Sequence, residues 1–576
     1  MSKQKKHILI LDGDQFSTLA IVRSLGRKGL MITVAAVEDN AICRHSKYTH
    51  NFFTYPNPLI NTDDFYKSIL DRLNINTYEL VIPVTELTTL PLAKIRKQIE
   101  QKTILAVADD SALEQVTDKA QTFKLAKELG VPVPISYTIT NHQELKNCIE
   151  HIHYPIVLKP SRSITNPAND IRAKLTVDYA FSKEELQKKV ISLLKNSEII
   201  LQEYFEGTGV GIELIADQGK IIHAFQHQRQ HELPLTGGGS CLRKSVAINP
   251  TLLKYSQDLI KALNWHGVAM VEFKYNETNN QSCLMEINGR FWGSLPLAVS
   301  SGSDFPWYLY QLLIDNKHPE QFQSEIGHFS RKIQEDLYWY IQVIFRRDNS
   351  PLIKWPKKSL LIKDFFSIFH YKHHFDAFYY QDMKPGFVEL ANTVSWFYNF
   401  SYDFINKKKL YKKHLRIKQS QALKKPLLKS KSVLFLCYGN INRSAAAECI
   451  YLQQNDTATL NIQSAGFHPI NNRPADPNMI KIAQENNINM TNCSSSMVNT
   501  AMLETADIIF AMEIEHLIRL KTEYPQFSEK AYLLGSLNPD HKASLEIDDP
   551  YGNSLDEYRN CFKQIQSSVK KITEIC

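Results

Sequence analysis

The chain has 576 residues, several times the length of one ordinary domain, so three or four folded units are expected. Hydrophobic residues make up 43% and charged residues 22%, which is typical of globular proteins and excludes a disordered or fibrous chain. The formal charge of +7 is uneven, because Lys407 to Lys431 holds eleven Lys or Arg residues and no acid, which leaves −4 for the rest.

Nothing in the sequence predicts a membrane-spanning or exported chain. The first apolar run ends after four residues, at Asp12, and is too short for a signal peptide. No run approaches the ~18 apolar residues that span a bilayer. The nine cysteines are dispersed without disulfide-like spacing, which indicates reduced thiols. We therefore expect a cytoplasmic protein.

Residues 1–110 alternate short apolar runs with helical patterns. Strands are expected at His7 to Ile10, Met31 to Val37, Tyr78 to Glu86 and Thr103 to Asp109, with a helix after the first. This alternation predicts a parallel, Rossmann-like open sheet. The turn after the first strand, GDQFST, lacks G-x-G-x-x-G, so we expect a packing scaffold and no dinucleotide site.

Two later strands carry acidic and amide side chains. In LMEINGR, the two-residue period of a strand places Glu286 and Asn288 on one face and turns Met285 and Ile287 inward. Glu272, in VEFKY, lies on the preceding strand of an expected hairpin and can sit opposite. Two carboxylates and an amide oxygen suit a Mg²⁺ ion that bridges ATP phosphates. A solvated strand face is the alternative.

These residues belong to a longer series that resembles the ATP-grasp fold. The series contains Lys119, Lys159, Gln202 to Phe205 (QEYF), Glu272, Glu286, Asn288 and Arg290, in that order. Residues 1 to about 330 are similar to bacterial ATP-grasp proteins of the carboxylate–amine ligase type. By this resemblance, residues 1–110 are a pre-ATP-grasp domain and residues 111–330 an ATP-grasp domain.

The resemblance implies a role for each position. The nucleotide-binding residues it implies are Lys119, Lys159, Gln202, Glu203, Tyr204, Phe205 and Glu213. The implied ligands of Mg²⁺ (or Mn²⁺) are Glu272, Glu286 and Asn288, with Arg290 near the transferred phosphoryl group. ATP would phosphorylate a small-molecule carboxylate to an acylphosphate, which an amine or another nucleophile would capture.

The segment His227 to Ser245 is polar and rich in glycine. Its run Gly237 to Ser240 is expected to close over phosphates or substrate, with Arg229 and Arg243 binding a carboxylate. An ordinary mobile loop is nearly as good an interpretation.

Residues 331–406 form an aromatic-rich extension with helical patterns at Asp336 to Arg347 and Glu389 to Phe400. We expect a helical layer on the ATP-grasp domain, followed by a solvated basic linker at 407–431. A second interpretation is a membrane-surface patch, because basic clusters attract anionic headgroups. Nucleic-acid binding is not expected, because only Tyr411 offers a stacking aromatic within the basic run.

The stretch VLFLCYGNINRSAAA, Val433 to Ala447, contains C-x5-R-S between an expected strand and an expected helix. Backbone N–H groups, the helix dipole and the Arg443 guanidinium all favour negative charge there. They would stabilise both a thiolate on Cys437 and a bound phosphate, so the thiolate can attack phosphorus. Asp549, in IDDPYG, is the candidate proton donor to the leaving group.

Loop and acid occur in this order in low-molecular-weight protein tyrosine phosphatases, which residues 432–576 resemble throughout. The resemblance extends to SAGF (Ser464 to Phe467), RPADP (Arg473 to Pro477) and ADIIFAME (Ala506 to Glu513). It implies Cys437 as nucleophile, Arg443 as transition-state clamp, Asn440 and Ser444 as hydrogen-bonding groups of the loop, and Asp549 as acid and later base. No cofactor or metal is implied for this domain.

This sequence departs from the family pattern in three places. Asn442 stands where many members have a second cysteine, so no disulfide can form within the loop. Cys493 to Ser496 occupies a segment that often carries an arginine, which would weaken support of the loop. Asp548 stands beside Asp549, so the proton donor is not unique.

The predicted fold class is therefore α/β and α+β multidomain: a Rossmann-like pre-ATP-grasp domain, an ATP-grasp fold, and a doubly wound α/β phosphatase domain. The predicted function is a bifunctional enzyme, an ATP- and Mg-dependent carboxylate ligase fused to a phosphatase that acts on phosphotyrosine protein. By analogy, the partner would be a tyrosine kinase of a polysaccharide pathway.

Two alternatives stay open. The C-terminal domain could reduce arsenate, which needs resolving cysteines, and Cys449 and Cys493 are the candidates nearby in sequence. The ATP-grasp domain could instead be a nucleotide-sensing scaffold that regulates the phosphatase.

Overall fold

The computed structural model describes residues 6–160, 177–194, 198–320, 323–345, 350–454 and 460–576. The chain divides into two compact units, Met1–Ser395 and Trp396–Cys576. Each unit contains a parallel sheet with helices, and the first unit contains two further, largely antiparallel sheets. The mixed α/β multidomain class expected from the sequence is confirmed.

The first unit begins with a five-stranded parallel sheet in the order β3-β2-β1-β4-β5. Its strands are β1 (His7–Ile10), β2 (Met31–Ala36), β3 (Asn51–Thr54), β4 (Leu80–Ile82) and β5 (Ile104–Leu105). Ile8 and Ile10 pack on the side of α1 (Phe16–Arg27), whereas Leu9 packs on the side of α2 (Thr62–Ile75). Because both faces are covered, the central strand is apolar from Ile8 to Ile10.

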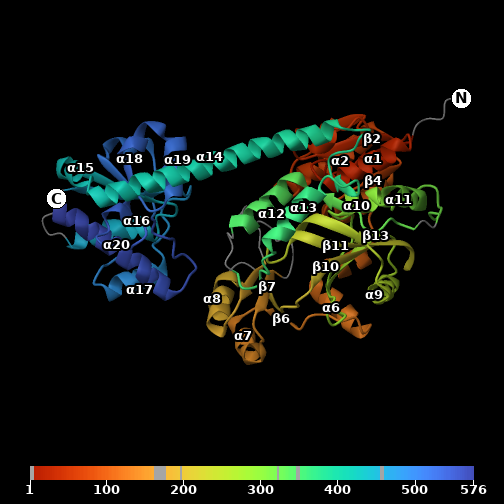
Figure 1. Cartoon of the computed structure of the whole chain (residues 1–576), viewed down its shortest axis with the longest axis horizontal. Helices are drawn as coiled ribbons and strands as arrows, with labels where there is room; N and C mark the ends of the chain where they lie inside the picture. The colour runs from red at the N-terminus through yellow and green to blue at the C-terminus, as the bar shows by residue number, and fades with distance from the viewer. Residues whose placement is uncertain (1–5, 161–176, 195–197, 321–322, 346–349, 455–459) are drawn as a thin grey trace. The chain divides into compact units, whose positions relative to one another are not determined.

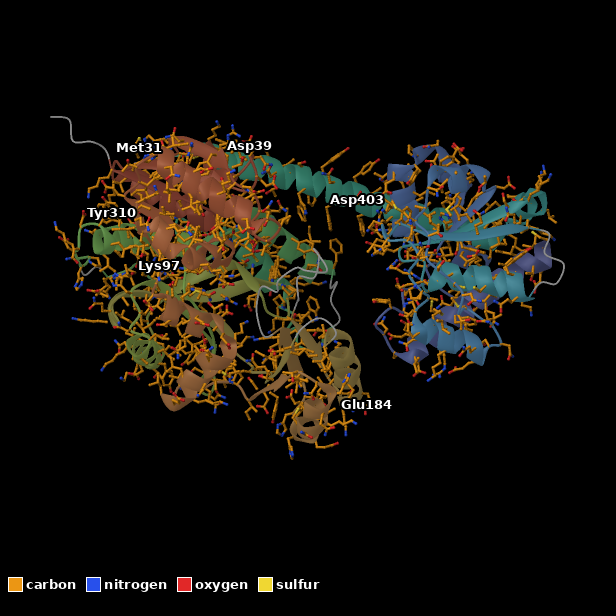
Figure 2. All side chains as sticks on the ribbon, turned by 180° about the vertical axis from the view of Figure 1, so that it is seen from behind. Met31, Asp39, Lys97, Glu184, Tyr310 and Asp403 are labelled. Carbon is orange, nitrogen blue, oxygen red and sulfur yellow. The ribbon has the colours of Figure 1, made fainter. Side chains whose placement is uncertain are left out.

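The expected parallel sheet is confirmed, but β3 was not predicted. Its four residues, NFFT, are exposed or half-exposed at the edge of the sheet, so they form no buried apolar run. Helices α10 (Leu295–Ser300) and α11 (Phe305–Leu313), far later in the chain, share the core on the α1 side (Figures 1 and 2). Tyr310 of α11, labelled in Figure 2, is buried there.

Two sheets enclose the expected nucleotide site. The smaller, in the order β6-β9-β7-β8, contains β6 (Ser136–Ile139), β7 (Ile156–Pro160), β8 (Asp178–Ala180) and β9 (Ile199–Glu203). The larger, in the order β14-β13-β10-β11-β12-β15-β16, contains β10 (Thr208–Asp217), β11 (Lys220–Leu233), β12 (Gly239–Val246), β13 (Gly267–Asn276), β14 (Gln281–Asn288), β15 (Phe329–Arg331) and β16 (His373–Phe375).

The expected hairpin of metal strands is confirmed as β13 and β14, with Glu272 opposite Glu286. The prediction that Met285 turns into the core was wrong. The register shifts after Glu272, where Phe273 pairs with Leu284, so Met285 is the extra residue of a β-bulge. Met285 consequently lines the same pocket as Glu286, whereas Ile287 is buried as expected.

The interpretation of His227 to Ser245 as a loop was wrong for most of its length. The segment is the end of β11 and nearly all of β12, joined by a short turn at 234–238. Arg243 and Ser245 point into the interior as polar residues of β12, and both are fully buried. Most of their hydrogen-bond partners lie later in the chain, so the local sequence did not indicate that these polar residues are buried and suggested a polar loop.

The extension forms three helices, α12 (Ile333–Phe345), α13 (Lys358–Ser367) and α14 (Lys384–Ser420). The helical pattern predicted at Glu389 to Phe400 is confirmed, and the one predicted at Asp336 to Arg347 is confirmed as far as Phe345, because Arg347 lies outside the described residues. β15 and β16 also add this region to the large sheet. None of the residues of α13 is buried. Among the residues that the structure describes, no helix combines the length and apolar character needed to cross a bilayer.

The second unit contains a four-stranded parallel sheet in the order β18-β17-β19-β20. Its strands are β17 (Ser432–Cys437), β18 (Asn461–Gly466), β19 (Ile508–Ala511) and β20 (Ala531–Leu533). Val433 and Phe435 pack with α16 (Arg443–Gln454) and α20 (Leu555–Ile575), and Leu434 and Leu436 pack with α19 (Ile514–Glu523). Helices therefore cover both faces, as expected for a doubly wound domain.

The basic run at 407–431 is not a solvated linker. It forms the last part of α14 and then α15 (Lys424–Lys429). Leu423 and Leu427 of this run are buried in the core of the second unit. The Lys418 ammonium donates to the carbonyl oxygens of Asp540 and Ala543, at 2.7 and 3.0 Å. Most of the other lysines of the run are exposed, while Leu423 and Leu427 form a buried apolar pair among them.

Candidate active sites

The first candidate site lies at the carboxyl end of the parallel sheet in the second unit. β17 ends at Cys437 and α16 begins at Arg443, so five residues form the loop predicted from the sequence. Cys437 is 2% exposed. Its sulfur accepts the backbone N–H of Asn440 at 3.1 Å and lies 2.9 Å from the Ser444 hydroxyl. Both contacts stabilise negative charge on sulfur.

Asn440 shapes the loop. Its φ of 53° lies in the left-handed region, which asparagine tolerates better than most residues. Its amide nitrogen donates to the hydroxyls of Ser444 and Ser464, at 2.9 and 2.8 Å. Its amide oxygen accepts the backbone N–H of Ser496 at 2.7 Å. The side chain thus joins the loop to α16, β18 and the 493–498 segment.

Arg443 joins the loop to the candidate acid. Its guanidinium donates to Asp549 at 2.6 Å and to the Ile547 carbonyl at 2.8 Å, and it lies 2.9 Å from Glu513. Although burial opposes it, the negative charges of Cys437, Asp549 and Glu513 raise the pKa of Arg443. The structure therefore brings together Cys437, Asn440, Arg443, Ser444 and Asp549.

The sequence analysis missed Glu513 and His516, which lie where the chain leaves β19. They line a cleft with Tyr438 and Arg519. Burial and the positive charges of Arg443 and Arg519 lower the pKa of His516 to about 3, so this imidazole is neutral. The only sequence signal was position, because ligand sites gather at the carboxyl ends of parallel strands.

The serine-rich segment, one of the three departures from the family pattern, has structural compensation. The Arg473 guanidinium donates to the Gly439 carbonyl at 2.5 Å, and Ser496 holds Asn440, so the loop has support despite the serine-rich segment. Asn442, the last residue of the loop, is buried. Cys449 and Cys493, the candidate resolving cysteines, contact each other, with 2.7 Å between their sulfurs. Asp548 is exposed, whereas Asp549 is half-buried beside Arg443.

The second candidate site lies in the first unit, in a pocket between the small and large antiparallel sheets. The expected residues that line it are Lys119, Lys159, Gln202, Glu203, Tyr204, Phe205, Glu272 and Glu286. The Lys159 ammonium donates to the Gln202 side-chain oxygen at 2.6 Å. Burial and the nearby charge of Lys119 lower the pKa of Lys159 to about 8. Two cations in one pocket favour a polyanionic ligand.

The carboxylates of the two metal strands are each balanced by a cation. Glu286 lies 3.5 Å from the Lys119 ammonium and accepts the Asn288 amide at 3.1 Å. Glu272 lies 2.6 Å from the Arg229 guanidinium. Burial raises the pKa of Glu272, whereas Lys119 and the Asn288 hydrogen bond overcome burial and lower the pKa of Glu286.

Glu272, Glu286 and Asn288 have the chemistry to bind a divalent cation, since they offer two carboxylates on facing strands and one amide. Among the described residues, no group of three His, Cys, Asp or Glu side chains gathers as a metal site. The amide of Asn288 is therefore needed to complete a three-residue set.

Arg229 and Arg243, the two arginines expected to bind a carboxylate, have different positions. Arg229 lines the pocket, and Gly209 makes room for it, because a Cβ at Gly209 would lie 2.7 Å from the Arg229 side chain. Arg243 is fully buried and bound to Asp376 at 2.6 Å, so it does not face the pocket. The expectation that Arg243 binds substrate was wrong, because its charge is already paired in the interior.

Glu213 also lies away from the pocket. It is fully buried on β10, 2.8 Å from a His227 ring nitrogen, and it accepts the Ser294 hydroxyl at 2.5 Å. Because Glu213 is buried with these two partners, its role is to pair polar groups in the interior of the large sheet. The nucleotide-binding role expected for Glu213 has no support from this position.

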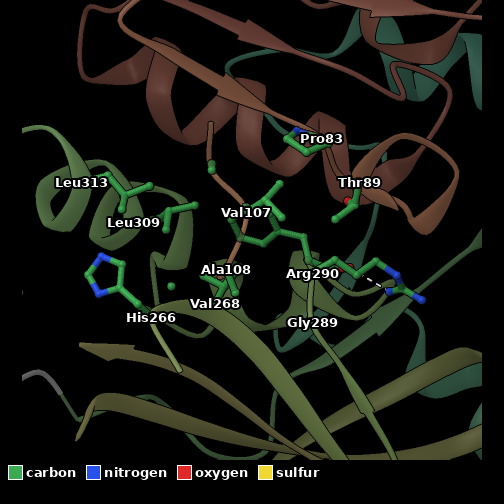
Figure 3. A pocket seen from close by; sticks show the side chains of 13 residues that line it. Pro83, Thr89, Val107, Ala108, His266, Val268, Gly289, Arg290, Leu309 and Leu313 are labelled. Carbon is green, nitrogen blue, oxygen red and sulfur yellow. Dashed lines mark hydrogen bonds between the residues drawn. The ribbon is translucent and has the colours of Figure 1, made fainter. Parts of the chain in front are cut away.

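Arg290 follows β14, where the large sheet meets the N-terminal domain that contains β1 to β5. Its guanidinium donates to Glu86 at 3.3 Å and to the Phe291 carbonyl at 2.8 Å. Figure 3 shows Arg290 beside a pocket that Pro83 and Val107 line from the N-terminal domain and Leu309 lines from α11. A second, adjoining pocket connects Arg290 with Asn288, Glu286 and Lys119. Arg290 thus lies next to the expected metal and phosphate residues.

Two known families match parts of the chain. The family described as "Low molecular weight phosphotyrosine protein phosphatase" matches residues 432–575. The family described as "ATP-grasp in the biosynthetic pathway with Ter operon" matches residues 195–333.

Curated relatives match the same two regions. The large chain of carbamoyl phosphate synthase, C-terminal section, from Methanopyrus kandleri is 24% identical over 221 residues, 36% of this chain and 38% of that protein. The low molecular weight protein-tyrosine-phosphatase Wzb of Escherichia coli K12 is 28% identical over 140 residues, 24% of this chain and 91% of the relative. A protein-arginine-phosphatase of Bacillus subtilis is 25% identical over 145 residues, 25% of this chain and 94% of the relative.

Proposed function

We propose that this chain, which carries an ATP-grasp domain and a C-terminal low molecular weight phosphotyrosine protein phosphatase domain, has two enzymatic activities. The first is ATP-dependent activation of a carboxylate for ligation, and the second is hydrolysis of phosphotyrosine in a protein. The observation that carries the second is the contact of Arg443, in the nucleophile loop, with Asp549, 106 residues later.

In the phosphatase reaction, the Cys437 sulfur attacks phosphorus and the bond to the leaving oxygen breaks. The loop N–H groups and the Arg443 guanidinium hold the phosphoryl oxygens as their charge develops. Asp549 gives its proton to the leaving phenolate oxygen. It then takes a proton from the water that attacks the cysteinyl-phosphate, which restores the thiolate and releases phosphate.

Substitution of the two adjacent aspartates tests this proposal. Asp549→Asn should lower kcat for a phosphotyrosine peptide by roughly 10²- to 10⁴-fold, because the leaving group loses its proton donor. Asp548→Asn is the matched control, since the neighbouring carboxylate is exposed, and it should change kcat by less than about threefold. Cys437→Ser should remove activity altogether. Equal effects of the two Asn substitutions would contradict the assignment of Asp549.

For the ligase reaction, Lys119 and Lys159 bind the phosphates of ATP, and the Gln202 to Phe205 connector, which lines the same pocket, binds the adenine. Glu272, Glu286 and Asn288 would hold Mg²⁺ or Mn²⁺, which neutralises phosphate charge and orients the γ-phosphoryl group when bound. Arg290 binds the acceptor carboxylate or the transferred phosphoryl group from the adjoining pocket. An amine then displaces phosphate from the acylphosphate. Arg229 balances Glu272 during these steps.

Nucleotide binding tests this half of the proposal. Glu286→Ala should weaken Mg-ATP binding in calorimetry by at least about tenfold, because one of two facing carboxylates is lost. Glu277→Ala removes an exposed carboxylate near the turn between β13 and β14 and should leave the affinity unchanged. If both variants bind Mg-ATP as tightly as the parent, the metal assignment is refuted.

The phosphatase substrate is a phosphotyrosine protein, and a tyrosine kinase of a polysaccharide pathway is the specific partner we propose. Phosphoarginine is the second candidate, because the Bacillus subtilis relative is a protein-arginine-phosphatase. Rates with otherwise identical phosphotyrosine and phosphoarginine peptides decide between them. A kcat/KM at least tenfold higher for phosphotyrosine would support the first assignment.

Besides packing on the ATP-grasp domain, the extension at residues 331–406 is a candidate for contact with a membrane surface. Helix α13 exposes Phe366 and, just beyond its end, Phe369, whereas its acid, Asp364, faces Arg331. Exposed aromatics beside lysines suit an anionic lipid surface. Co-sedimentation of the full chain with phosphatidylglycerol vesicles, compared with phosphatidylcholine vesicles, tests this contact.

A further inference from the structure

Two cysteines of the phosphatase unit contact each other away from the nucleophile. Cys449 lies on α16, two turns after the loop, and Cys493 lies in the segment that supports the loop. Their sulfurs are 2.7 Å apart, and both are free thiols. A disulfide bond is about 2.05 Å long, so the two sulfurs are already within about 0.65 Å of the separation that a disulfide has.

The two thiols differ in exposure. Cys449 is 6% exposed, inside the core that α16 and α20 share. Cys493 is half-buried between the exposed residues Asn492 and Ser494. An oxidant in solution can therefore reach Cys493 directly. Cys449, which is buried in contact with Cys493, is the second thiol of the pair.

Both cysteines are adjacent to the groups that hold Asn440. Glu448, next to Cys449, accepts the Ser464 hydroxyl at 2.5 Å, and Ser464 in turn accepts the Asn440 amide. Three residues after Cys493, the Ser496 N–H donates to the other end of that amide. The main chain at Cys493 is itself fixed, since its carbonyl accepts the Ala475 N–H at 3.2 Å. A covalent link between the two segments would therefore fix Asn440 from both sides.

We propose that Cys449 and Cys493 are a reversible redox modification site, which a peroxide oxidises to a disulfide that clamps the phosphate loop through Asn440. This site is distinct from the nucleophile, which has no partner cysteine within its loop because Asn442 precedes Arg443. The inference does not depend on the catalytic activity, since bond formation is measured on the thiols themselves.

The chemistry balances with hydrogen peroxide as oxidant. The Cys493 thiolate attacks one peroxide oxygen, the O–O bond breaks, and the departing hydroxide takes up the thiol proton as water, which leaves a sulfenic acid. The Cys449 sulfur then attacks the Cys493 sulfur, the S–O bond breaks, and a second water leaves with the Cys449 proton. Two electrons pass from the sulfurs to the peroxide. The hydrogen bond with Cys449 lowers the pKa of Cys493, which favours Cys493 as the attacking thiolate.

The test uses the full chain with Cys437→Ser, which removes the reactive nucleophile from the oxidation chemistry. After treatment with hydrogen peroxide, peptide mapping by mass spectrometry should find the 449–493 disulfide, and dithiothreitol should remove it. The bond closes a loop of 44 residues, so Tm of the phosphatase unit should rise by about 5–10 °C. Amide hydrogen exchange of residues 438–442 should slow in the oxidised protein.

Matched variants separate this site from other thiols. Cys493→Ser should abolish the disulfide and the rise in Tm, whereas Cys561→Ser, which removes a buried cysteine of the same core, should keep both. The proposal is overturned if peroxide leaves both thiols free, or if either cysteine pairs elsewhere. It is equally overturned if the bond forms but exchange at 438–442 does not slow. If Cys493→Ser or Cys561→Ser folds poorly, peptide mapping of the Cys437→Ser chain still shows whether the 449–493 disulfide forms.

Discussion

At the scale of single residues, both sites are built from charges that are buried together with a partner. Glu272 and Glu286 face each other across two strands, and each has its own cation, Arg229 or Lys119. Without those cations, two carboxylates in one pocket would repel each other and take up protons. The nucleophile loop follows the same rule, because Arg443 is surrounded by three acceptors from two later segments, Glu513 and residues 547–549.

Lys159 leads to a prediction about pH. Its pKa of about 8 means that half of the free protein carries a neutral Lys159 at pH 8, whereas ATP phosphates would favour the charged form. We therefore expect ATP binding to take up about half a proton at pH 8 and almost none at pH 6.5. Calorimetry in Tris and HEPES, whose ionisation enthalpies differ, measures this uptake. Equal uptake at both pH values would contradict the assignment.

The same shift affects stability in a defined direction. Because the folded pKa lies below the usual 10.5, the unfolded chain binds more protons between about pH 8 and 10.5. The contribution of Lys159 therefore makes the free protein more stable as pH rises through that window. Below pH 8 the ammonium is buried beside Lys119, and its repulsion opposes folding until an anion binds.

At the scale of elements, the basic run shows how a charge pattern can conceal a packed helix. The run would be solvated if its lysines decided its conformation. Instead, Leu423, the N-cap of α15, and Leu427, within α15, are both buried in the core of the second unit. In the segment 227–245, polar residues likewise conceal a buried strand. The charge of Arg243 can be buried there because it pairs with Asp376. In both elements, the decisive partner lies far away in the sequence.

Adjacent leucines of α15 test this interpretation. Leu427 is fully buried, whereas Leu428 is 60% exposed. Leu427→Ala should destabilise the phosphatase unit by about 2–5 kcal/mol, which lowers its Tm by roughly 5–15 °C. Leu428→Ala is the control and should leave Tm within about 1 °C. A solvated linker would instead make the two substitutions indistinguishable in thermal unfolding of the full chain.

At the scale of the whole molecule, the two sites draw on different units. Every residue assigned to ATP binding precedes Ser395, and every residue assigned to phosphate hydrolysis follows Trp396. Each unit also has its own buried core. This division supports two activities that do not share catalytic groups.

This separation predicts little energetic coupling. A saturating, non-hydrolysable ATP analogue with Mg²⁺ should leave kcat/KM for a phosphotyrosine peptide unchanged within about twofold, since no residue is common to the two sites. Steady-state kinetics with and without the analogue measure the effect. A change of tenfold or more would reveal coupling of about 1.4 kcal/mol and would contradict the prediction.

The sequence by itself determined the chemistry whose residues are close together or follow a strict period. C-x5-R-S between a strand and a helix indicated the phosphate loop, and alternation in LMEINGR indicated the metal strands. Both patterns are local, because a loop at a helix N-terminus and a strand face depend on neighbouring residues only.

Only the tertiary structure decided which distant charges meet and which polar residues are buried. Asp549 was a candidate by sequence, but its contact with Arg443 depends on how the 547–549 segment crosses the end of the sheet. Arg243 and Glu213 looked available to ligands until Asp376 and His227 proved to be their partners. The bulge at Met285 and the pair of Cys449 and Cys493 likewise depend on register and packing. Such contacts follow from the three-dimensional path of the chain, which local residue patterns do not specify.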